Sequence, residues 1–299
     1  MNKLLFIFLD GVGLGLNSEI NPIKNLFKNL TGVDFVLNNY PIINDDFLLK
    51  PIDAVLGING IPQSATGQTS IMTGVNSQRR LGFHHTAFPN RELINIIKEK
   101  NILLELKNRG LSVTCANMYS KEYFEKRESR SKNMLPVSAL SVKTSNLPFR
   151  FMDDYNKNEA VFADITNEII RSRGYNIDII TPQIAGSNML NICNKNDFTF
   201  FEYFITDTYG HKKEELKLIS ETQKLNSFIE YIWNSGQNGV DIILTSDHGN
   251  CEDISTGNHT KNPVPFLYLS KDSSLKGKFF REVENITHFK GAILNRFGF

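Results

Sequence analysis

Three features of the chain predict an α/β fold with a central, mainly parallel sheet. Short apolar runs at 3–9, 200–206, 240–246 and 265–270 are typical of strands that are buried on both faces. Between the second and third of these runs, residues 214–236 have apolar side chains at helical spacing. Because strand, helix and strand follow one another in this order, we expect a right-handed crossover between parallel strands.

The middle of the chain is less regular. Residues 91–110 predict one or two helices and residues 111–119 a short strand, whereas the polar stretch that follows has no clean periodicity. We expect residues 86–180 to form a small inserted cap, part of which belongs to the sheet domain. The core would then consist of two segments, 1–85 and 181–299.

The composition excludes several classes of protein. The chain has 33 Lys and Arg residues against 32 Asp and Glu residues, so it has no broad basic surface for nucleic acid. No stretch approaches the roughly 20 apolar residues of a membrane span, and the apolar run at 4–9 is too short for a signal peptide. Cys115, Cys193 and Cys251 are far apart and lack a metal-type spacing, as expected of reduced thiols. We therefore expect a cytoplasmic protein that binds neither nucleic acid nor a membrane, with its oligomeric state left open.

Acidic residues and histidines gather where the predicted strands end. In open α/β sheets, ligands bind just beyond the carboxyl ends of the strands. Six side chains are expected there: Asp10, Asp207, His211, Asp247, His248 and His259. A single Asp at a strand end is more often a turn former, and a single His is more often a surface or core residue. Several carboxylates and imidazoles converging on one edge would repel or mispair without cations, so together they predict divalent metals.

Four motifs contain these six residues, and a fifth lies apart from them in the N-terminal third of the chain. They are FLDGVG at 8–13, SATGQTSIMTG at 64–74, DTYGH at 207–211, TSDHGN at 245–250 and NHTKNPVPF at 258–266. Taken together and in this order, they resemble the alkaline phosphatase superfamily, within it the branch of cofactor-independent phosphoglycerate mutase and phosphopentomutase. The resemblance implies an alkaline-phosphatase-like sandwich with a small inserted cap. It also implies metal-dependent phosphoryl transfer on a small phosphorylated substrate.

The same resemblance implies two sites for divalent metal ions, Mn or Zn. The matching positions are Asp10, Ser64, Asp247 and His248 for one ion, and Asp207, His211 and His259 for the other. Ser64 also matches the phosphorylated nucleophile of this branch, since it lies three residues before Gly67. Thr66 and Thr69 remain alternative nucleophiles. At Gln68 the chain departs from the branch, where a His usually follows the Gly, and we assign Gln68 no ligand role.

Four residues after the nucleophile region are candidates for substrate binding: Arg79, Arg80, His84 and His85. Guanidinium groups suit phosphate oxygens because they can bind them in a bidentate manner. The alternative is that this segment is a solvated helix end. His288, near the C-terminus, is expected to be structural.

The function predicted from these motifs is phosphoryl transfer through a phosphoserine. We favour a phosphohydrolase, because a cap of at most residues 86–180 would shield the phosphoserine poorly from water. A phosphomutase is the alternative, and a non-catalytic binding protein on the same fold is an alternative of another class. A sulfatase is disfavoured because no Cys-x-Pro/Ala-x-Arg stretch stands at the nucleophile.

Overall fold

The computed structural model describes residues 2–37, 40–128, 134–236 and 239–299. Within these residues, seven strands form one sheet in the order β2–β3–β7–β6–β1–β5–β4. The strands are β1 Lys3–Leu9, β2 Ile42–Ile43, β3 Phe47–Ile52, β4 Val113–Cys115, β5 Phe198–Tyr203, β6 Val240–Thr245 and β7 Val264–Leu269. Strands β4, β5, β1, β6 and β3 point the same way, whereas β7 and β2 run opposite to them. The predicted α/β class with a mostly parallel sheet is confirmed.

The strand predicted at 200–206 is wrong in its bounds. Strand β5 ends at Tyr203, and helix α11 (Ile205–His211) begins two residues later. Asp207 therefore lies in the first turn of a helix rather than at the tip of a strand. The apolar run FFEYFIT continues across this boundary because Ile205 is buried in the core like the strand residues before it. Strands β2 and β3 were not predicted from the sequence.

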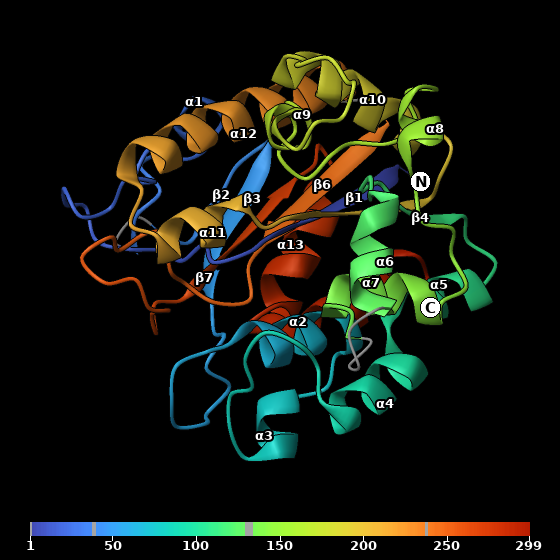
Figure 1. The fold of residues 1–299 in the computed structure, drawn as a ribbon. Helices are drawn as coiled ribbons and strands as arrows, with labels where there is room; N and C mark the ends of the chain where they lie inside the picture. The colour runs from blue at the N-terminus through green and yellow to red at the C-terminus, as the bar shows by residue number, and fades with distance from the viewer. Residues whose placement is uncertain (1, 38–39, 129–133, 237–238) are drawn as a thin grey trace.

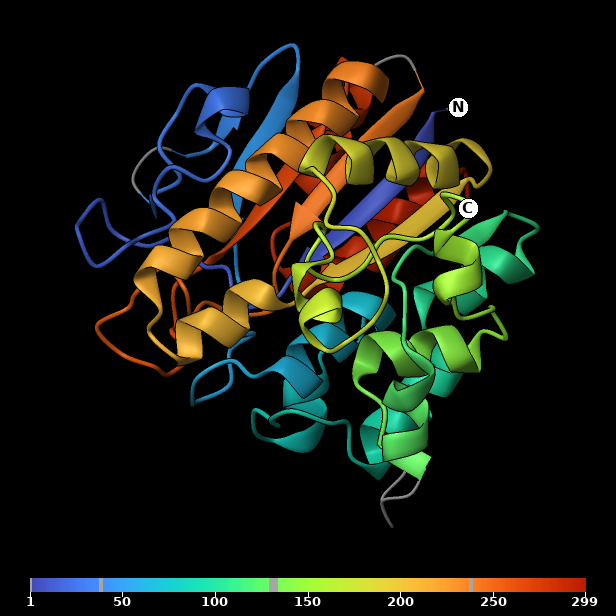
Figure 2. The ribbon, with the colours of Figure 1, turned by 45° about the horizontal axis from the view of Figure 1, so that its top comes forward.

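Helices cover both faces of the sheet, so the molecule has three layers (Figure 1). On one face lie α10 (Pro182–Asn194) and α12 (Glu215–Gly236), which pack against each other across the strands (Figure 2). Their buried side chains meet the odd-numbered residues of β1, Leu5, Ile7 and Leu9. Since alternate residues of a strand face opposite sides, the even-numbered residues of β1 face the other layer.

The second layer contains α2, which places the candidate nucleophile. The helices of this layer are α2 Ser64–Thr73, α3 Ser77–Leu81, α4 Arg91–Lys100, α5 Ile102–Asn108, α7 Val137–Thr144, α13 Ser273–Glu282, η2 Ile286–His288 and α14 Phe289–Arg296. The core here includes Leu4, Phe6 and Phe8 of β1. Every residue of α2 after Ser64 is buried, because the sheet lies on one side of this helix and α4 and η2 lie on others.

Residues 86–180 contribute both to this core and to a smaller structure of their own. Helices α4, α5 and α7 pack in the second layer, and β4 forms the edge of the sheet beside β5. The rest includes α6 (Lys121–Glu128), α8 (Met152–Tyr155) and α9 (Glu168–Ser172). A separate apolar cluster is formed by Met118, Ala160, Phe162, Ile170 and Ile177. We propose that the cap lies within residues 118–180.

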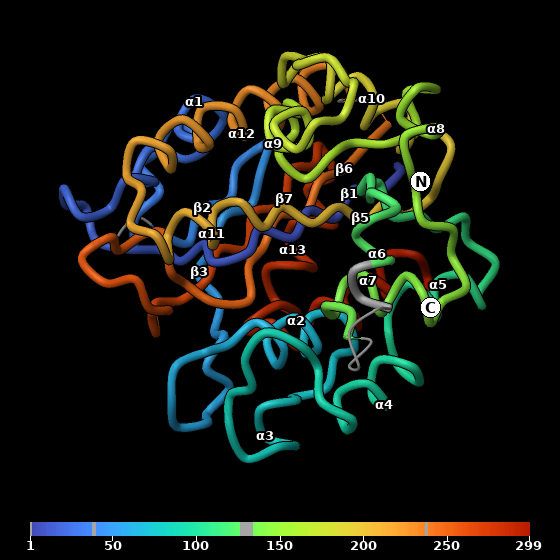
Figure 3. The backbone as a smooth tube through the Cα atoms, in the orientation of Figure 1, coloured from blue at the N-terminus to red at the C-terminus, as the bar shows by residue number. Residues whose placement is uncertain are grey.

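The two chain ends lie on the same side of the molecule (Figure 3), where the Arg296 guanidinium donates to the Asn2 carbonyl at 2.8 Å. Among the described residues, none of the helices combines the length and apolar character needed to cross a membrane. The three cysteines are free thiols, and all three are buried.

Candidate metal centre

Two carboxylates lie side by side because they follow adjacent parallel strands. Asp10 comes directly after β1, and Asp247 comes two residues after β6, which pairs with β1. Asp247 is fully buried and Asp10 is 8% exposed. Burial raises the pKa of each well above the ordinary value, and the charges of neighbouring carboxylates raise it further. Both would therefore be costly to ionise without a cation.

The hydrogen bonding of these carboxylates fits a cation between them. Neither oxygen of Asp247 makes a hydrogen bond of normal geometry, although the Gln68 amide and the Gly11 N–H lie near enough to lower its pKa. Oδ1 of Asp10 also has no hydrogen-bond partner. Buried polar atoms are nearly always satisfied in proteins, so such a cluster calls for a missing partner. Divalent ions bound by carboxylates and imidazoles are the partner that this donor set suits.

His248 completes the first cluster. Its Nε2 lies 3.4 Å from Asp10 Oδ1 and 3.5 Å from Asp247 Oδ2. Donor atoms of Asp10, Asp247 and His248 all lie within 4.8 Å of one another. Because burial lowers the pKa of His248 to about 3, its imidazole is neutral at physiological pH. A neutral imidazole is the form that binds a metal.

A second cluster lies beside the first and contains Asp207, His211 and His259. Asp207 Oδ2 is 3.3 Å from His211 Nε2, and Asp207 Oδ1 is 3.6 Å from His259 Nε2. Donor atoms of Asp207, His248 and His259 also lie within 4.8 Å of one another, so His248 adjoins both clusters. The rings of His248 and His259 stack with centroids 3.6 Å apart.

Backbone carbonyls orient the two outer histidines. His211 Nδ1 is 2.7 Å from the Gly257 oxygen, and His259 Nδ1 is 3.0 Å from the Pro62 oxygen. Because a carbonyl can only accept, each Nδ1 carries a proton and each Nε2 is left to face the cluster. The two Nε2 atoms are 3.1 Å apart, a distance at which two lone pairs repel unless a cation or proton is shared. The hydrogen bond between His211 and Asp207 raises the pKa of His211 to about 9. In the metal-free protein His211 therefore carries a proton at Nε2 as well.

The structure brings Ser64 to the same centre. Ser64 is the first residue of α2, and its Oγ is 2.9 Å from His248 Nε2. The alternative hydroxyls are engaged elsewhere: Thr66 Oγ1 donates to the Gln63 carbonyl and Thr69 Oγ1 to the Ala65 carbonyl. Ser64 is thus the hydroxyl that adjoins the clustered carboxylates and imidazoles.

Part of the chain is similar in sequence or in fold to known metalloenzymes. Residues 153–299 match the model of the metalloenzyme superfamily. The chain is 32% identical over 81 residues to the 2,3-bisphosphoglycerate-independent phosphoglycerate mutase of Haloarcula marismortui, which covers 25% of this chain and 15% of the mutase. It is 25% identical over 139 residues to the mutase of the same name from Haloquadratum walsbyi, covering 42% of this chain and 27% of that one. The alkaline phosphatase of the Antarctic bacterium TAB5 shares the fold, with a TM-score of 0.53 at 14% identity, covering 98% of this chain and 97% of the phosphatase.

The match to the metalloenzyme superfamily over residues 153–299, together with the matching mutases and the shared fold, supports the predicted membership of the alkaline phosphatase superfamily. Members of this superfamily are typically metal-dependent phosphoryl-transfer enzymes. The matched segments span only 15% and 27% of the lengths of the two mutases.

Two residues of α2, Gly67 and Gln68, lie against the first cluster. A Cβ on Gly67 would lie 2.7 Å from the Asp247 Cβ and 2.9 Å from the Asp247 backbone oxygen, so only glycine lets α2 approach Asp247. The side chain of Gln68 reaches back towards the first cluster, with its Nε2 3.5 Å from Asp10 Oδ2. Gln68 therefore contacts a predicted ligand through its amide, although we assigned it no ligand role.

Glu252 is a buried residue that sequence reasoning missed. Its Oε2 accepts from the Gly13 N–H at 3.0 Å and from the Asn250 N–H at 2.8 Å. Its Oε1 accepts from the Asn262 amide at 3.0 Å and from the Thr260 hydroxyl. Glu252 thus ties together the loops that present Asp10, His248 and His259. The signal for it was its place directly after DHGNC, inside the motif region.

We expect Glu252→Gln to weaken the metal centre without touching a ligand. A glutamine keeps one acceptor oxygen, so it cannot accept both from the N–H groups of Gly13 and Asn250 and from the side chains of Thr260 and Asn262. Loss of such supporting contacts typically reduces metal affinity roughly 10–100-fold. Metal titration followed by calorimetry measures the change. The control is Asp253→Asn, since the Asp253 carboxylate accepts from the nearby N–H and hydroxyl of Ser255; equal losses in both variants would contradict the role of Glu252.

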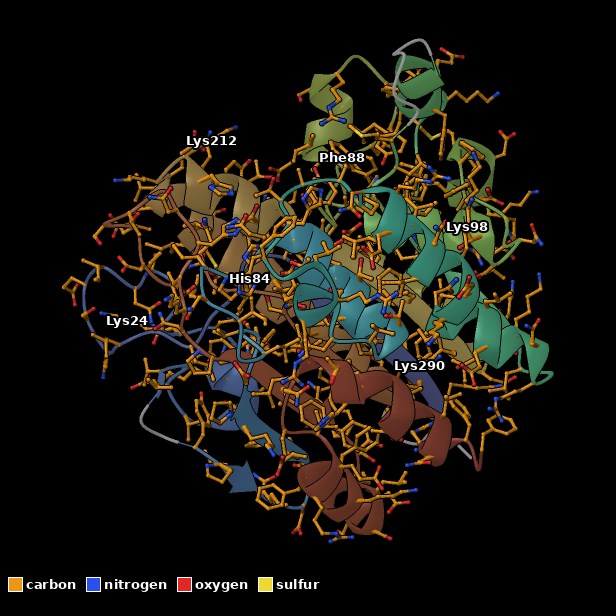
Figure 4. The ribbon with its side chains drawn as sticks, turned by 90° about the horizontal axis from the view of Figure 1, so that it is seen from below. Lys24, His84, Phe88, Lys98, Lys212 and Lys290 are labelled. Atoms are coloured by element: carbon orange, nitrogen blue, oxygen red, sulfur yellow. The ribbon has the colours of Figure 1, made fainter. Side chains whose placement is uncertain are left out.

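The four residues predicted for substrate binding lie apart from the centre. Arg79 and Arg80 are exposed on α3, and Arg80 pairs with Glu92 at 2.8 Å. His84 and Phe88 lie in the loop between α3 and α4 (Figure 4), and His84 Nε2 contacts the Ile58 carbonyl at 3.1 Å. The backbone N–H of His85 donates to Thr66 Oγ1. None of the four lines the cavity beside Ser64, and their role in substrate binding stays a prediction. His288 bonds to Asn285 and to the Glu284 N–H, as expected of a structural residue.

A cavity of about 310 Å³ opens from the metal centre. Asp10, Ser64, Gln68 and Asp207 line one end of it. The remaining lining comes from the α3–α4 loop, from residues 117–123 and 162–173, and from the carboxyl end of β5. An ester bound with its phosphate at Ser64 would therefore place its alcohol part in this cavity.

Proposed function

We propose that the protein transfers phosphoryl groups from a small phosphate ester through a phosphorylated Ser64, with water as the usual acceptor. Two divalent ions, Mn or Zn, would be held by Asp10, Ser64, Asp247 and His248 and by Asp207, His211 and His259. The observation that carries the proposal is the Ser64 hydroxyl. It stands at the N-terminus of a buried helix, 2.9 Å from His248 Nε2, and it opens on a cavity.

Each group has a role in the transfer. The ions, when bound, supply charge that favours the Ser64 alkoxide and neutralises phosphoryl oxygens. His248 orients the Ser64 hydroxyl, and the free N–H groups at the start of α2 face the phosphoryl oxygens. The Ser64 Oγ–P bond forms as the ester P–O bond breaks, and the alcohol leaves carrying a proton. Water then attacks the same phosphorus, which releases inorganic phosphate and restores the hydroxyl.

A phosphomutase is the second candidate, since the proteins that match in sequence carry the name of a mutase. A mutase returns the phosphate from Ser64 to a second hydroxyl of the same alcohol, and this requires water to be kept out. We favour the hydrolase because the proposed cap, within residues 118–180, is small. Its described helices α6, α8 and α9 have eight, four and five residues.

One experiment tests the function and separates the two candidates. Purified protein is supplied with Mn or Zn, and its metal content is measured; a two-metal site predicts about two ions per chain. Phosphate esters, including p-nitrophenyl phosphate and sugar phosphates, are then followed by phosphorus NMR. Steady release of inorganic phosphate supports the hydrolase. Migration of phosphate between hydroxyls of one substrate would establish the mutase instead, and no reaction with any ester would refute phosphoryl transfer.

A further inference from the structure

The cavity beside Ser64 has a mostly apolar and aromatic lining. Its large side chains are Phe88, Met118, Tyr119, Tyr123, Phe162 and Phe204. They come from the α3–α4 loop, from the chain after β4, from α6, from the chain between α8 and α9, and from the chain between β5 and α11. Pockets of this kind favour flat or apolar ligand parts, and the few polar groups within them decide orientation and specificity.

Glu202 is the buried acid of this cavity outside the metal clusters. It belongs to β5 and lines the cavity while only 8% exposed. Its neighbours Phe201 and Tyr203 face α10 and α12, so strand alternation turns Glu202 towards the α2 side. Asn117 fixes its backbone twice: the Asn117 amide donates to the Glu202 carbonyl at 2.8 Å, and the Glu202 N–H donates to Asn117 Oδ1 at 2.9 Å.

The carboxylate of Glu202 accepts a hydrogen bond but has no cationic partner among the described residues. Ser138 Oγ donates to Glu202 Oε2 at 2.5 Å, and no salt bridge to Glu202 is formed within the described residues. Burial raises its pKa to about 7. A buried carboxylate in an apolar pocket gains most from a ligand that donates an N–H or O–H to it, and loses most from a ligand that brings another negative charge.

The described lining of the cavity disfavours a second acidic group on the substrate. Among the described residues that line it, Arg173 is the one cation, and Arg173 is exposed at the rim. A small acid such as phosphoglycerate carries a carboxylate besides its phosphate. In this cavity that carboxylate would lie among aromatic rings and near Glu202, with no buried cation from the described lining to pair with it.

We propose that this cavity binds the alcohol part of the substrate and that this part is an uncharged aromatic or heterocyclic group, as in a nucleoside monophosphate. The group carries an N–H or O–H donor, and Glu202 accepts a hydrogen bond from it. The inference rests on the proposed function. It makes Glu202 a specificity-determining residue, because it favours neutral donors and opposes acidic substrates.

The test compares wild type with Glu202→Gln on three kinds of ester. They are the four nucleoside 5′-monophosphates, 3-phosphoglycerate, and p-nitrophenyl phosphate, which has no donor and reports the chemistry at Ser64 alone. In the wild type we expect kcat/KM for at least one nucleotide to exceed that for 3-phosphoglycerate at least tenfold. At pH 8, above the pKa of about 7 for Glu202, Glu202→Gln should lower the nucleotide value roughly tenfold, mainly through KM, since a charged acceptor becomes neutral. It should raise the value for 3-phosphoglycerate.

A matched control is Glu221→Gln. Glu221 is also buried and accepts from a hydroxyl, that of Tyr203 at 2.5 Å, but it does not line the cavity. It should leave the ratio of nucleotide to 3-phosphoglycerate unchanged. A second measurement needs no variant: nucleosides should inhibit turnover of p-nitrophenyl phosphate by wild type, and glycerate should not.

The outcomes separate the two proposals. Failure of every ester, p-nitrophenyl phosphate included, with both Mn and Zn would refute the proposed function and this inference with it. Turnover of p-nitrophenyl phosphate together with a preference for 3-phosphoglycerate, or with inhibition by glycerate rather than nucleosides, would refute the inference alone. Equal effects of Glu202→Gln and Glu221→Gln on the substrate ratio would also overturn it.

Discussion

Replacing Ser64 by alanine is expected to lower phosphoryl transfer by at least about 10³-fold, because the variant lacks the attacking oxygen. The fold should persist, since Ser64 is the first residue of α2 and is less buried than the residues that follow it. Metal content should fall by at most one ion, because Asp207, His211 and His259 form the second cluster without Ser64. Turnover of p-nitrophenyl phosphate and metal analysis on the same sample measure both effects.

The covalent step has its own readout. Wild type quenched in acid during turnover should carry phosphate on Ser64, located by mass spectrometry of the peptide that contains residues 64–74. Thr66→Val and Thr69→Val, which remove the hydroxyl and keep the shape, serve as controls, since both hydroxyls donate to backbone carbonyls and should matter little for activity. Phosphate on Thr66 or Thr69 would show that the nucleophile has been assigned to the wrong residue.

The sequence was enough to predict the parts of the site that follow strands directly. Asp10 and Asp247 end runs of buried residues on neighbouring parallel strands, so chain direction alone brings them together. Asp207 lies at the same edge of the sheet but does not follow a strand directly. It stands in the first turn of α11, and the apolar residues of strand and helix run together in the sequence with no polar residue between them.

The cavity and the supporting contacts could not be predicted from local patterns. Glu202 and Asn117 meet because β4 pairs with β5, two strands separated by more than eighty residues in the chain. Glu252 joins loops from both ends of the chain through single hydrogen bonds. Such contacts depend on the packing of the folded chain and produce no periodic pattern of residues in the sequence. The substrate-binding role of Arg79, Arg80, His84 and His85 stays a prediction, since closeness to Ser64 along the chain did not place any of their side chains in the lining of the cavity.

Asp247→Asn is expected to change stability in opposite directions with and without metal. In the metal-free protein, burial and the charge of Asp207 raise the pKa of Asp247 above its ordinary value of 3.8. The folded state therefore binds a proton that the unfolded state has lost, so stability falls as the pH rises above about 4. Asparagine has no such cost. At neutral pH in the presence of EDTA, the variant should gain roughly 1–3 kcal/mol in free energy of unfolding and show a flatter pH dependence.

With Mn or Zn the order should reverse. A ligand at about 1,000 times its dissociation constant stabilises the folded state by about 4 kcal/mol, and the variant loses most of this at the first cluster. Asp241→Asn is the matched control, because Asp241 lies at the other end of β6 and pairs with Arg296 at 2.7 Å. Breaking that buried pair should cost roughly 3–5 kcal/mol whether or not metal is present. Thermal unfolding of the three proteins in EDTA and in Zn, at pH 5 and pH 7.5, decides the matter. If Asp247→Asn destabilises the metal-free protein as Asp241→Asn does, the Asp247 carboxylate is a structural group and not a ligand waiting for its cation.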